Sequence, residues 1–316
     1  MRWSFVVMLP LLAILVHCSD PPFGGDKGKA EPKDDKKPYL LVVPPTGGKE
    51  VKLVDWRFLL GTRRFALLDE PPINPKTKMP TGPEYLEFRE DKSTTFQNGI
   101  LTLVPIASLR KIDYDREKKT VTVVAVKAGD KEETLTGTTK FIGINKITIE
   151  ADAILEGLGA ASVKFQGGVD KDLGLRNITF PPAEAPPAVK GAAWSIVAAD
   201  KEKTKHVAHD LQPLYFIDGG YRVLPYVSFK TTVKIDMDKI AALRFIPSHD
   251  KKKISYDYEV TLKDGVKHML TMLTKIELEK KKTASFEGLL GRVPVGYKLF
   301  PSHTIQELRA AEDEKK

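Results

Sequence analysis

Cysteine is almost absent from this chain of 316 residues, because Cys18 is the only one. Everything after residue 18 therefore lacks the ligands for Zn–Cys sites and Fe–S clusters, and it offers no thiolate for catalysis. Internal disulfides are excluded as well. The folded part must be held together by its hydrophobic core alone.

Long hydrophobic runs are also scarce. The main apolar stretch extends from Trp3 to Val16, follows Arg2 and precedes His17-Cys18-Ser19-Asp20. A short positive region, a short apolar region and a cleavage-like site are typical of a secretory signal peptide. The stretch is shorter than the ~18–20 residues that a membrane-spanning helix needs. We therefore expect an exported protein with residues 1–18 as signal peptide and no transmembrane span in the mature chain.

Cys18 admits two interpretations. Leu15-Val16-His17-Cys18 resembles the lipobox of bacterial lipoproteins, in which the cysteine carries a lipid anchor. That motif has a small residue before the cysteine, which His17 is not, and ordinary cleavage after Cys18 is the alternative. Residues 19–38 are rich in Pro, Gly, Lys and Asp, so we expect a disordered tether. Both lipidation and cleavage at Cys18 remain open.

Familiar catalytic motifs are missing too. The sequence contains no Gly-x-Ser-x-Gly, His-Glu-x-x-His or phosphate-loop pattern. His206 and His209 are three residues apart, a spacing that shares one face of a helix but sends two side chains to opposite faces of a strand. We predict a strand here, which excludes chelation by this pair. We assign no catalytic residue, no metal site and no cofactor.

Charge of one sign does not dominate the chain. Lys and Arg number 50 against 42 Asp and Glu, for a net charge of +8, and both signs are well mixed. The run Lys251-Lys252-Lys253 precedes a predicted strand, so a solvated hairpin loop is the simpler interpretation, and binding of an anionic polymer is the alternative. We expect no nucleic acid as partner.

Alternating hydrophobicity predicts a mostly β protein. Between Ile254 and Leu262 every second residue is apolar, and Asp264-Gly265 follows as a hairpin turn. Many short strands separated by turns indicate small barrels or sandwiches. Good helix formers in Glu150–Leu158 and Ala192–Leu211 suggest few short helices beside the sheets. A strand followed by one tight helical turn is expected at four places: 103–112, 173–180, 235–245 and 299–308.

The Pro-rich segment from Pro181 to Pro187 divides the chain into two halves that resemble each other. Five correspondences occur in the same order in both halves, which predicts an internal duplication. They are Trp56 with Trp194, 83–85 with 213–215, 106–109 with 240–243, Gly129 with Gly265, and 155–158 with 286–289. We expect two tandem β-rich domains at 39–180 and 191–311, joined by a linker at 181–190 and followed by a charged tail at 312–316.

Trp56 and Trp194 are candidate binding residues, since exposed aromatic faces pack on sugar rings. The alternative, which we favour, is that each tryptophan fills the core of its own domain.

The sequence as a whole favours a non-enzymatic binding or scaffolding module of the cell envelope, in the periplasm, attached to the envelope or extracellular. Its expected ligand is an envelope protein or polymer, an anionic one among the candidates. Tandem copies support this hypothesis because linked weak sites gain avidity. The alternative is an envelope hydrolase with a His/Asp site in the second domain, which contains the following histidines: His206, His209, His249, His268 and His303.

Overall fold

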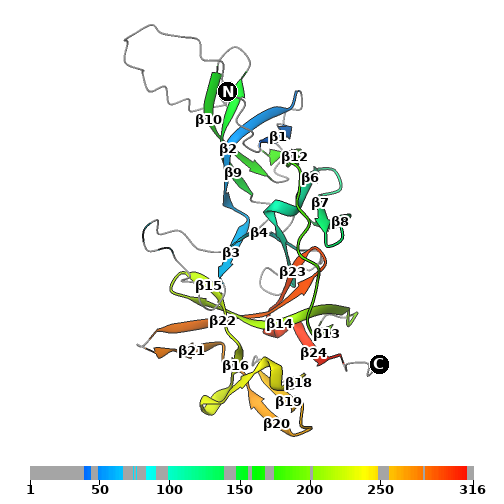
Figure 1. Ribbon diagram of the computed structural model, residues 1–316, viewed down its shortest axis with the longest axis vertical. Coiled ribbons are helices and arrows are strands. Elements are labelled where there is room, and N and C mark those ends of the chain that lie inside the picture. The colour runs from blue at the N-terminus through cyan, green and yellow to red at the C-terminus, as the bar shows by residue number, and fades with distance from the viewer. Residues whose placement is uncertain are drawn as a thin grey trace, which may run out of the picture.

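The computed structural model describes residues 39–43, 49–66, 74, 76, 83–89, 99–138, 147–155, 159–167, 174–199, 202–247, 256–279 and 282–311. In these residues the chain is mostly β-strand, and the helical elements are 3-10 turns of three residues. Figure 1 shows an elongated molecule with one sheet at each end and a barrel between them. The predicted signal peptide and tether lie outside the described residues.

The prediction of a mostly β fold is confirmed. Tyr258 and Val260 are buried while Glu259 between them is not, as the alternating pattern requires. The helices expected in Glu150–Leu158 and Ala192–Leu211 are wrong, because strands β9 (Thr148–Leu155), β13 (Ala193–Ala198) and β14 (Lys205–Ile217) occupy them. Each of these strands has a hydrogen-bonded neighbour on both sides, and this pairing outweighs a weak helix propensity.

The sheet at one end has nine strands and is built entirely from residues before the Pro-rich segment. Its order is β11-β10-β9-β2-β1-β12-β6-β7-β8. The strands not yet given are β1 (Leu40–Val43), β2 (Val51–Leu60), β6 (Leu109–Asp115), β7 (Thr120–Lys127), β8 (Lys131–Thr138), β10 (Gly159–Gly167), β11 (Gly174–Leu175) and β12 (Asn177–Thr179).

A closed seven-strand barrel forms the middle of the molecule. Its order is β14-β15-β3-β4-β5-β23-β22, and antiparallel pairing of β22 with β14 closes the ring. Strands β3 (Thr62–Ala66), β4 (Glu84–Phe88) and β5 (Leu101–Pro105) precede the Pro-rich segment, whereas β15 (Gly220–Val223), β22 (Thr283–Val293) and β23 (Gly296–Phe300) follow it. The two halves of the chain therefore share one barrel.

The sheet at the other end, which we call the end sheet, extends from the barrel through β14. Its order outward is β13, β24 (Ile305–Ala310), β18 (Ile240–Ile246), β19 (Asp257–Leu262) and β20 (Lys267–Thr271). Three short strands complete the fold. β21 (Lys275–Glu277) pairs with β22, and β16 (Tyr226–Ser228) with β17 (Lys234–Asp236).

The same order of antiparallel strands occurs twice. In the nine-stranded sheet it is β10-β9-β2-β1-β12-β6-β7-β8, and in the second half it is β23-β22-β14-β13-β24-β18-β19-β20. In both series the last hairpin turn contains a glycine with positive φ, Gly129 at 87° and Gly265 at 88°. The two tryptophans occupy different places in this order, Trp56 on β2 and Trp194 on β13.

Three of the four expected tight turns after a strand are confirmed as 3-10 turns. They are η1 (Ile106–Ser108), η4 (Met237–Lys239) and η6 (Ser302–Thr304), and each leads directly into another strand. The fourth segment, 173–180, contains no 3-10 turn in its described part. Ile106 begins the 3-10 turn η1, whereas Ile240, its expected counterpart, follows η4 and begins strand β18.

Large side chains fill the barrel. Its buried cluster consists of Phe65, Tyr85, Leu101, Leu103, Leu214, Val223, Leu290 and Leu299. A ring of seven strands is narrow enough for side chains to occupy the space inside. The barrel is therefore a packed core whose ends, rather than its inside, are accessible to ligands.

The Pro-rich segment runs along the side of the molecule from β12 to β13 (Figure 1). The backbone N–H of Glu184 donates a hydrogen bond to the carbonyl oxygen of Ala107 at 2.8 Å. The segment is thus attached to the first half at η1.

Gly296 provides a test of the pairing between β5 and β23, which joins the two halves of the chain in the barrel. Its φ is 138°, and a Cβ there would lie 2.3 Å from the carbonyl oxygen of Leu103 on β5. We expect Gly296→Ala to lower the free energy of unfolding by about 3 kcal/mol or more, because strain and a backbone clash add. Gly265→Ala is the control: it has a φ of 88° but nothing within 4 Å, so we expect about 1 kcal/mol. Urea unfolding followed by circular dichroism measures both, and equal losses would contradict the clash.

Candidate functional site

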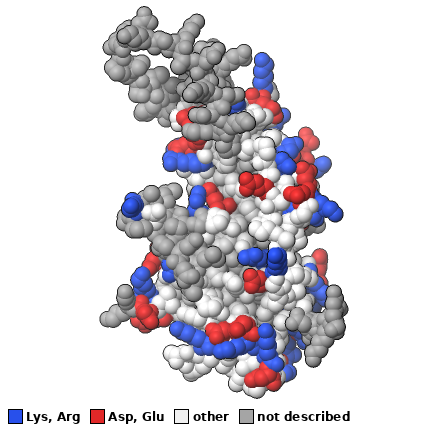
Figure 2. Space-filling model, viewed as in Figure 1, with Lys and Arg blue, Asp and Glu red and all other residues white. Residues whose placement is uncertain are grey.

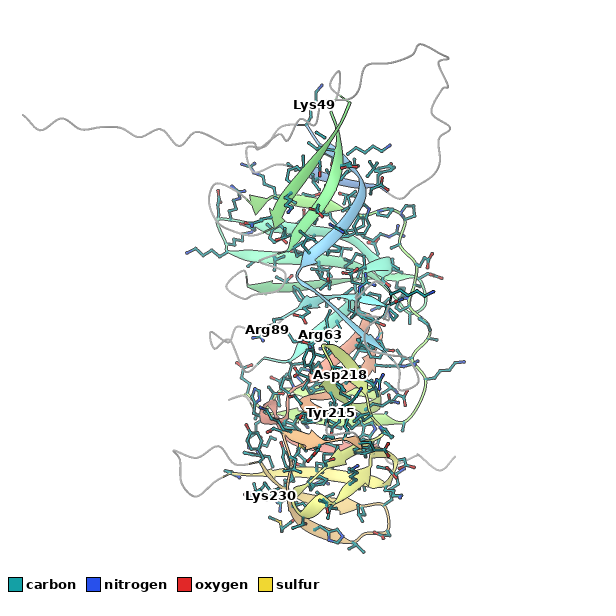
Figure 3. The ribbon with its side chains drawn as sticks, turned by 90° about the vertical axis from the view of Figure 1, so that its left-hand side faces the viewer. Lys49, Arg63, Arg89, Tyr215, Asp218 and Lys230 are labelled. Carbon is teal, nitrogen blue, oxygen red and sulfur yellow. The ribbon has the colours of Figure 1, made fainter. Side chains whose placement is uncertain are left out.

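One end of the barrel gathers charged and aromatic side chains, and we call it the mouth. Here β3 begins, β4 and β14 end, and β15 begins, as the pairings of Thr62 with Leu86 and of Ile217 with Gly220 show. The side chains of the mouth are Arg63, Glu87, Phe216, Tyr221 and Glu287, from five strands. In Figure 3, Arg63 is labelled at the level of the barrel, above Asp218 of the β14–β15 turn.

Arg63 is the centre of this group. Its side chain is only 12% exposed, and its Nε donates a hydrogen bond to Oε1 of Glu87. The guanidinium lies 4.2 Å from the centre of the Tyr221 ring, a cation–π distance. Its Nη1 is buried and has no hydrogen-bond partner. A buried N–H group without a partner is costly, so an acceptor that reached this atom would remove that cost.

Glu287 reaches the mouth through a β-bulge. The pairing of Leu214 with Gly288 and of Tyr215 with Phe286 leaves Glu287 as the extra residue of β22. Gly288 makes this bulge possible, because a Cβ there would lie 2.4 Å from the carbonyl oxygen of Phe300. The sequence Glu287-Gly288 thus turns a carboxylate toward Arg63.

Burial raises the pKa of Glu287 above its usual range. The nearby Arg63 guanidinium opposes this shift, and the negative charge of Glu87 adds to it. Burial also raises the pKa of Tyr221, against the effect of Arg63. The mouth therefore contains one guanidinium, one carboxylate bonded to it, and a second carboxyl group whose pKa is raised.

Phe216 adds an apolar surface to the mouth. It is 38% exposed, and its ring centre lies 5.2 Å from that of Tyr221. A flat apolar ring beside hydrogen-bond donors and acceptors suits a ligand that has both apolar faces and hydroxyl groups. A hydroxyl group can accept from Arg63 and donate to Glu87 or Glu287, whereas an anion would meet two carboxyl groups.

Aromatic packing blocks the barrel toward its other end. Phe65 stacks on Tyr85 with ring centres 4.4 Å apart, and Tyr297 meets both rings edge-on. Arg292 lies 5.9 Å from the centre of the Tyr297 ring, and its Nε is 3.7 Å from Oδ2 of Asp210. Burial raises the pKa of Tyr85 well above its usual range. The mouth is thus the end of the barrel that we consider as the candidate site.

An open hollow lies beside β16, β17 and β21, and it is where lysines and an aromatic ring meet. It is lined by Tyr226, Lys234, Glu277, Leu278, Glu279 and Lys282. The Nζ of Lys234 lies 4.8 Å from the centre of the Tyr226 ring, and that of Lys282 is 2.6 Å from Oδ2 of Asp218. On the face in Figure 2, Lys and Arg are interspersed with Asp and Glu. Two glutamates line the hollow beside its lysines, so it is a weaker anion site than its lysines alone suggest.

The candidates from the sequence do not meet at the mouth. Trp194 is 5% exposed, and Trp56 is partly buried against Phe58 and Phe180, with ring centres 5.6 and 6.1 Å away. Lys251, Lys252, Lys253 and Cys18 lie outside the described residues.

The four described histidines of the second half are separated from one another, and His249 lies outside the described residues. His206 and His209 are both on β14, in the predicted strand. The ring of His206 is 5.7 Å from that of Phe300, and Nδ1 of His209 is 3.3 Å from the carbonyl oxygen of Gly191. His268 is on β20 and His303 in η6. In the part of the chain that the structure describes, no three His, Cys, Asp or Glu residues are placed to hold a metal ion.

The mouth residues carry no recognisable sequence signal. Arg63 and Glu87 are 24 positions apart, and the other three come from the second half of the chain. Of these residues, the sequence analysis singled out only Glu287, as part of Phe286-Glu287-Gly288-Leu289, and only because this segment resembles residues 155–158.

No protein-family model matches this chain, and neither a curated protein nor a solved structure is similar to it at a significant level. Within the described ranges, no helix has the length and apolar character needed to cross a membrane. The chemistry of the mouth therefore carries the functional argument.

The raised pKa of Glu287 predicts a pH dependence of stability. A carboxyl group whose pKa is higher in the folded state stabilises fully below its ordinary pKa of 4.5, and this contribution is lost as the pH rises through the folded value. We expect Glu287→Gln, which stays neutral, to gain stability relative to the parent over this rise. Urea unfolding from pH 4 to 8 measures it.

Glu150→Gln is the matched control with the opposite sign. A hydrogen bond from Arg57 lowers the pKa of Glu150, so its contribution is lost as the pH falls through the folded value. A pH-independent difference between Glu287→Gln and the parent would contradict the assignment.

Arg63 and Arg64 are neighbours on β3 that allow a direct comparison. We expect Arg63→Met to lower the free energy of unfolding by about 2–4 kcal/mol, because it leaves Glu87 largely buried without its cation. Arg64, whose side chain is 38% exposed, pairs with Glu84, and Arg64→Met should cost less than about 1 kcal/mol. Chemical denaturation measures the free energy of unfolding of both variants. Equal losses in Arg63→Met and Arg64→Met would contradict the central role of Arg63.

Proposed function

We propose that this chain is an exported, non-enzymatic binding module of the cell envelope that holds a hydroxylated polymer at the barrel mouth. Export rests on the signal-like residues 1–18, and the location is the periplasm, the envelope surface or the extracellular medium. The ligand class rests on the mouth.

The observation that carries this proposal is the combination of an unpartnered buried guanidinium N–H with an exposed aromatic ring. Nη1 of Arg63 lacks an acceptor, and Phe216, which is 38% exposed, packs against the same Tyr221 ring that the guanidinium faces. Sugar rings present hydroxyl groups at their edges and C–H groups on their faces. They therefore satisfy the guanidinium and carboxyl groups and pack on the ring of Phe216 at the same time.

Internal duplication is the second part of the proposal. The repeated order of eight antiparallel strands supports it, as do the corresponding turns at Gly129 and Gly265. The barrel mouth breaks this symmetry, because β3 to β5 and β15 are placed between strands of the second series only. Two linked units with one specialised mouth suit a module that anchors or scaffolds an extended polymer.

An envelope hydrolase is the alternative, and Glu87 and Glu287 favour it. A carboxyl group of raised pKa with a second carboxyl group nearby is a usual arrangement of a general acid and its partner. Glu287, with the raised pKa, would be the acid. In such an enzyme these glutamates would replace the His/Asp site suggested by the sequence.

Co-sedimentation with isolated cell-envelope material tests the proposal. We expect the chain from residue 19 onward to be retained, and Phe216→Ala to weaken retention about 3- to 10-fold through loss of ring contact. Val207→Ala is the control, since Val207 lies on the same strand and is 62% exposed but is not in the mouth. Retention that resists added salt indicates stacking and hydroxyl contacts, whereas a steady decline with salt indicates the lysines instead.

Assay of the soluble fraction for released fragments separates binding from hydrolysis. Retention without fragments supports the binding module. Fragments that disappear in Glu287→Gln would establish the hydrolase, and absence of retention at every salt concentration would remove the proposal.

A further inference from the structure

The charges of the mouth are not balanced. Of the five side chains that define it, one carries a guanidinium, Arg63, and two carry carboxyl groups, Glu87 and Glu287. Arg63 is already hydrogen-bonded to Glu87, and among the described residues no cation forms an ion pair with Glu287. Tyr221 adds no charge, because burial raises the pKa of its hydroxyl group. With both carboxyl groups ionised, the mouth is therefore one positive charge short of neutrality.

The acidic and aromatic groups of the mouth are more exposed than its cation. Phe216 is 38% exposed, and the side chain of Glu87 is 22% exposed against 12% for that of Arg63. Glu287 is half-buried. A ligand that enters the mouth therefore meets carboxyl groups and an aromatic ring before it meets the guanidinium.

An ammonium group complements such a surface. A cation is attracted to carboxylates and to the faces of aromatic rings, as the contact of Arg63 with the Tyr221 ring at 4.2 Å illustrates. A positive charge beside Glu287 would also favour the ionised form of this carboxyl group. An acidic ligand would face two carboxyl groups, and a neutral ligand would leave the charge of Glu287 unbalanced.

We propose that the mouth binds an amino sugar polymer, with an ammonium group of the ligand paired with Glu287. The hydroxyl groups of the sugar remain to bond the other polar groups of the mouth, and its ring face packs on Phe216. This inference rests on the proposed binding of a hydroxylated polymer and narrows it to polymers that carry positive charge. A lysine-rich protein segment offers the same ammonium group but has neither the hydroxyl groups nor the ring faces.

Proton exchange on binding distinguishes a cationic ligand from a neutral one. Burial and the charge of Glu87 raise the pKa of Glu287, and the charge of Arg63 opposes them. A ligand ammonium lowers this pKa again, so binding releases protons and becomes stronger as the pH rises from 4 through the folded value. A neutral ligand that covers Glu287 buries it further, so its binding takes up protons instead. Tyr221, which also faces Glu287, keeps its proton over this range.

Isothermal titration calorimetry of the chain from residue 19 onward tests the proposal with soluble oligomers of glucosamine, N-acetylglucosamine and glucose. With the same linkage, these sugars differ only in the amine, acetamide or hydroxyl group on one ring carbon. Near pH 5 the amine carries its proton. We expect the glucosamine oligomer to bind about 5- to 10-fold more tightly than the other two, because a half-buried ion pair contributes more than an exposed one. We also expect it alone to release protons, which the dependence of the binding heat on the buffer's ionisation enthalpy measures.

Glu287→Gln and Glu84→Gln are the matched pair of variants. The first should abolish both the preference for the amine and the proton release. Glu84 lies on β4, as Glu87 does, and its side chain is 21% exposed, but it pairs with Arg64 outside the mouth, so its substitution should change neither.

Equal affinities for the three oligomers, or a preference that survives in Glu287→Gln, would overturn this inference and leave the proposed function standing. Binding of none of the oligomers, or of a lysine-rich peptide in place of all three, would overturn both.

Discussion

Pairing between strands from the two halves of the chain is the interaction on which the rest of the structure depends. β3 to β5 on one side and β14, β15, β22 and β23 on the other have free edges until they close into one ring. Closure satisfies the backbone hydrogen bonds of every strand in the ring and encloses a core of aromatic and leucine side chains. With no cysteine after residue 18, this closure and the core inside it hold the strands together without internal disulfides.

The mouth is a consequence of the same closure. Arg63 and Glu87 come from before the Pro-rich segment, and Phe216, Tyr221 and Glu287 come from after it. Burial at the end of a packed barrel raises the pKa of Glu287 and leaves Nη1 of Arg63 without a partner. Folding thus keeps a polar group in an unfavourable state at one place, and such places are where ligands contribute most.

The outer edge strands of the two sheets, β8 and β20, differ in their exposed side chains. β8 and β20 occupy the same position in their strand orders, but β8 forms ion pairs through two glutamates, Glu132 and Glu133, whereas β20 forms one through Lys267. In the end sheet Glu259 on β19 pairs with Arg244 on β18 and with Lys267 on β20, and the exposed Met269 lies opposite Glu259. A repeated strand order therefore does not imply a repeated surface, since side chains on the solvent face change without affecting the backbone pairing.

The sequence by itself determined the local features: the mostly β character, the strand at Asp257–Leu262 with its Asp264-Gly265 turn, and three of the tight turns after strands. Alternating burial and the residue preferences of turns depend on residues that are close together in the chain, so both can be predicted from the sequence. Helices were wrongly predicted where β9, β13 and β14 lie, because helix propensity is weaker than pairing with two neighbouring strands. Only the tertiary structure decided that the halves share a barrel and that five distant residues form its mouth. Strand partners and bulges depend on which edges meet, and no short-range pattern records that choice.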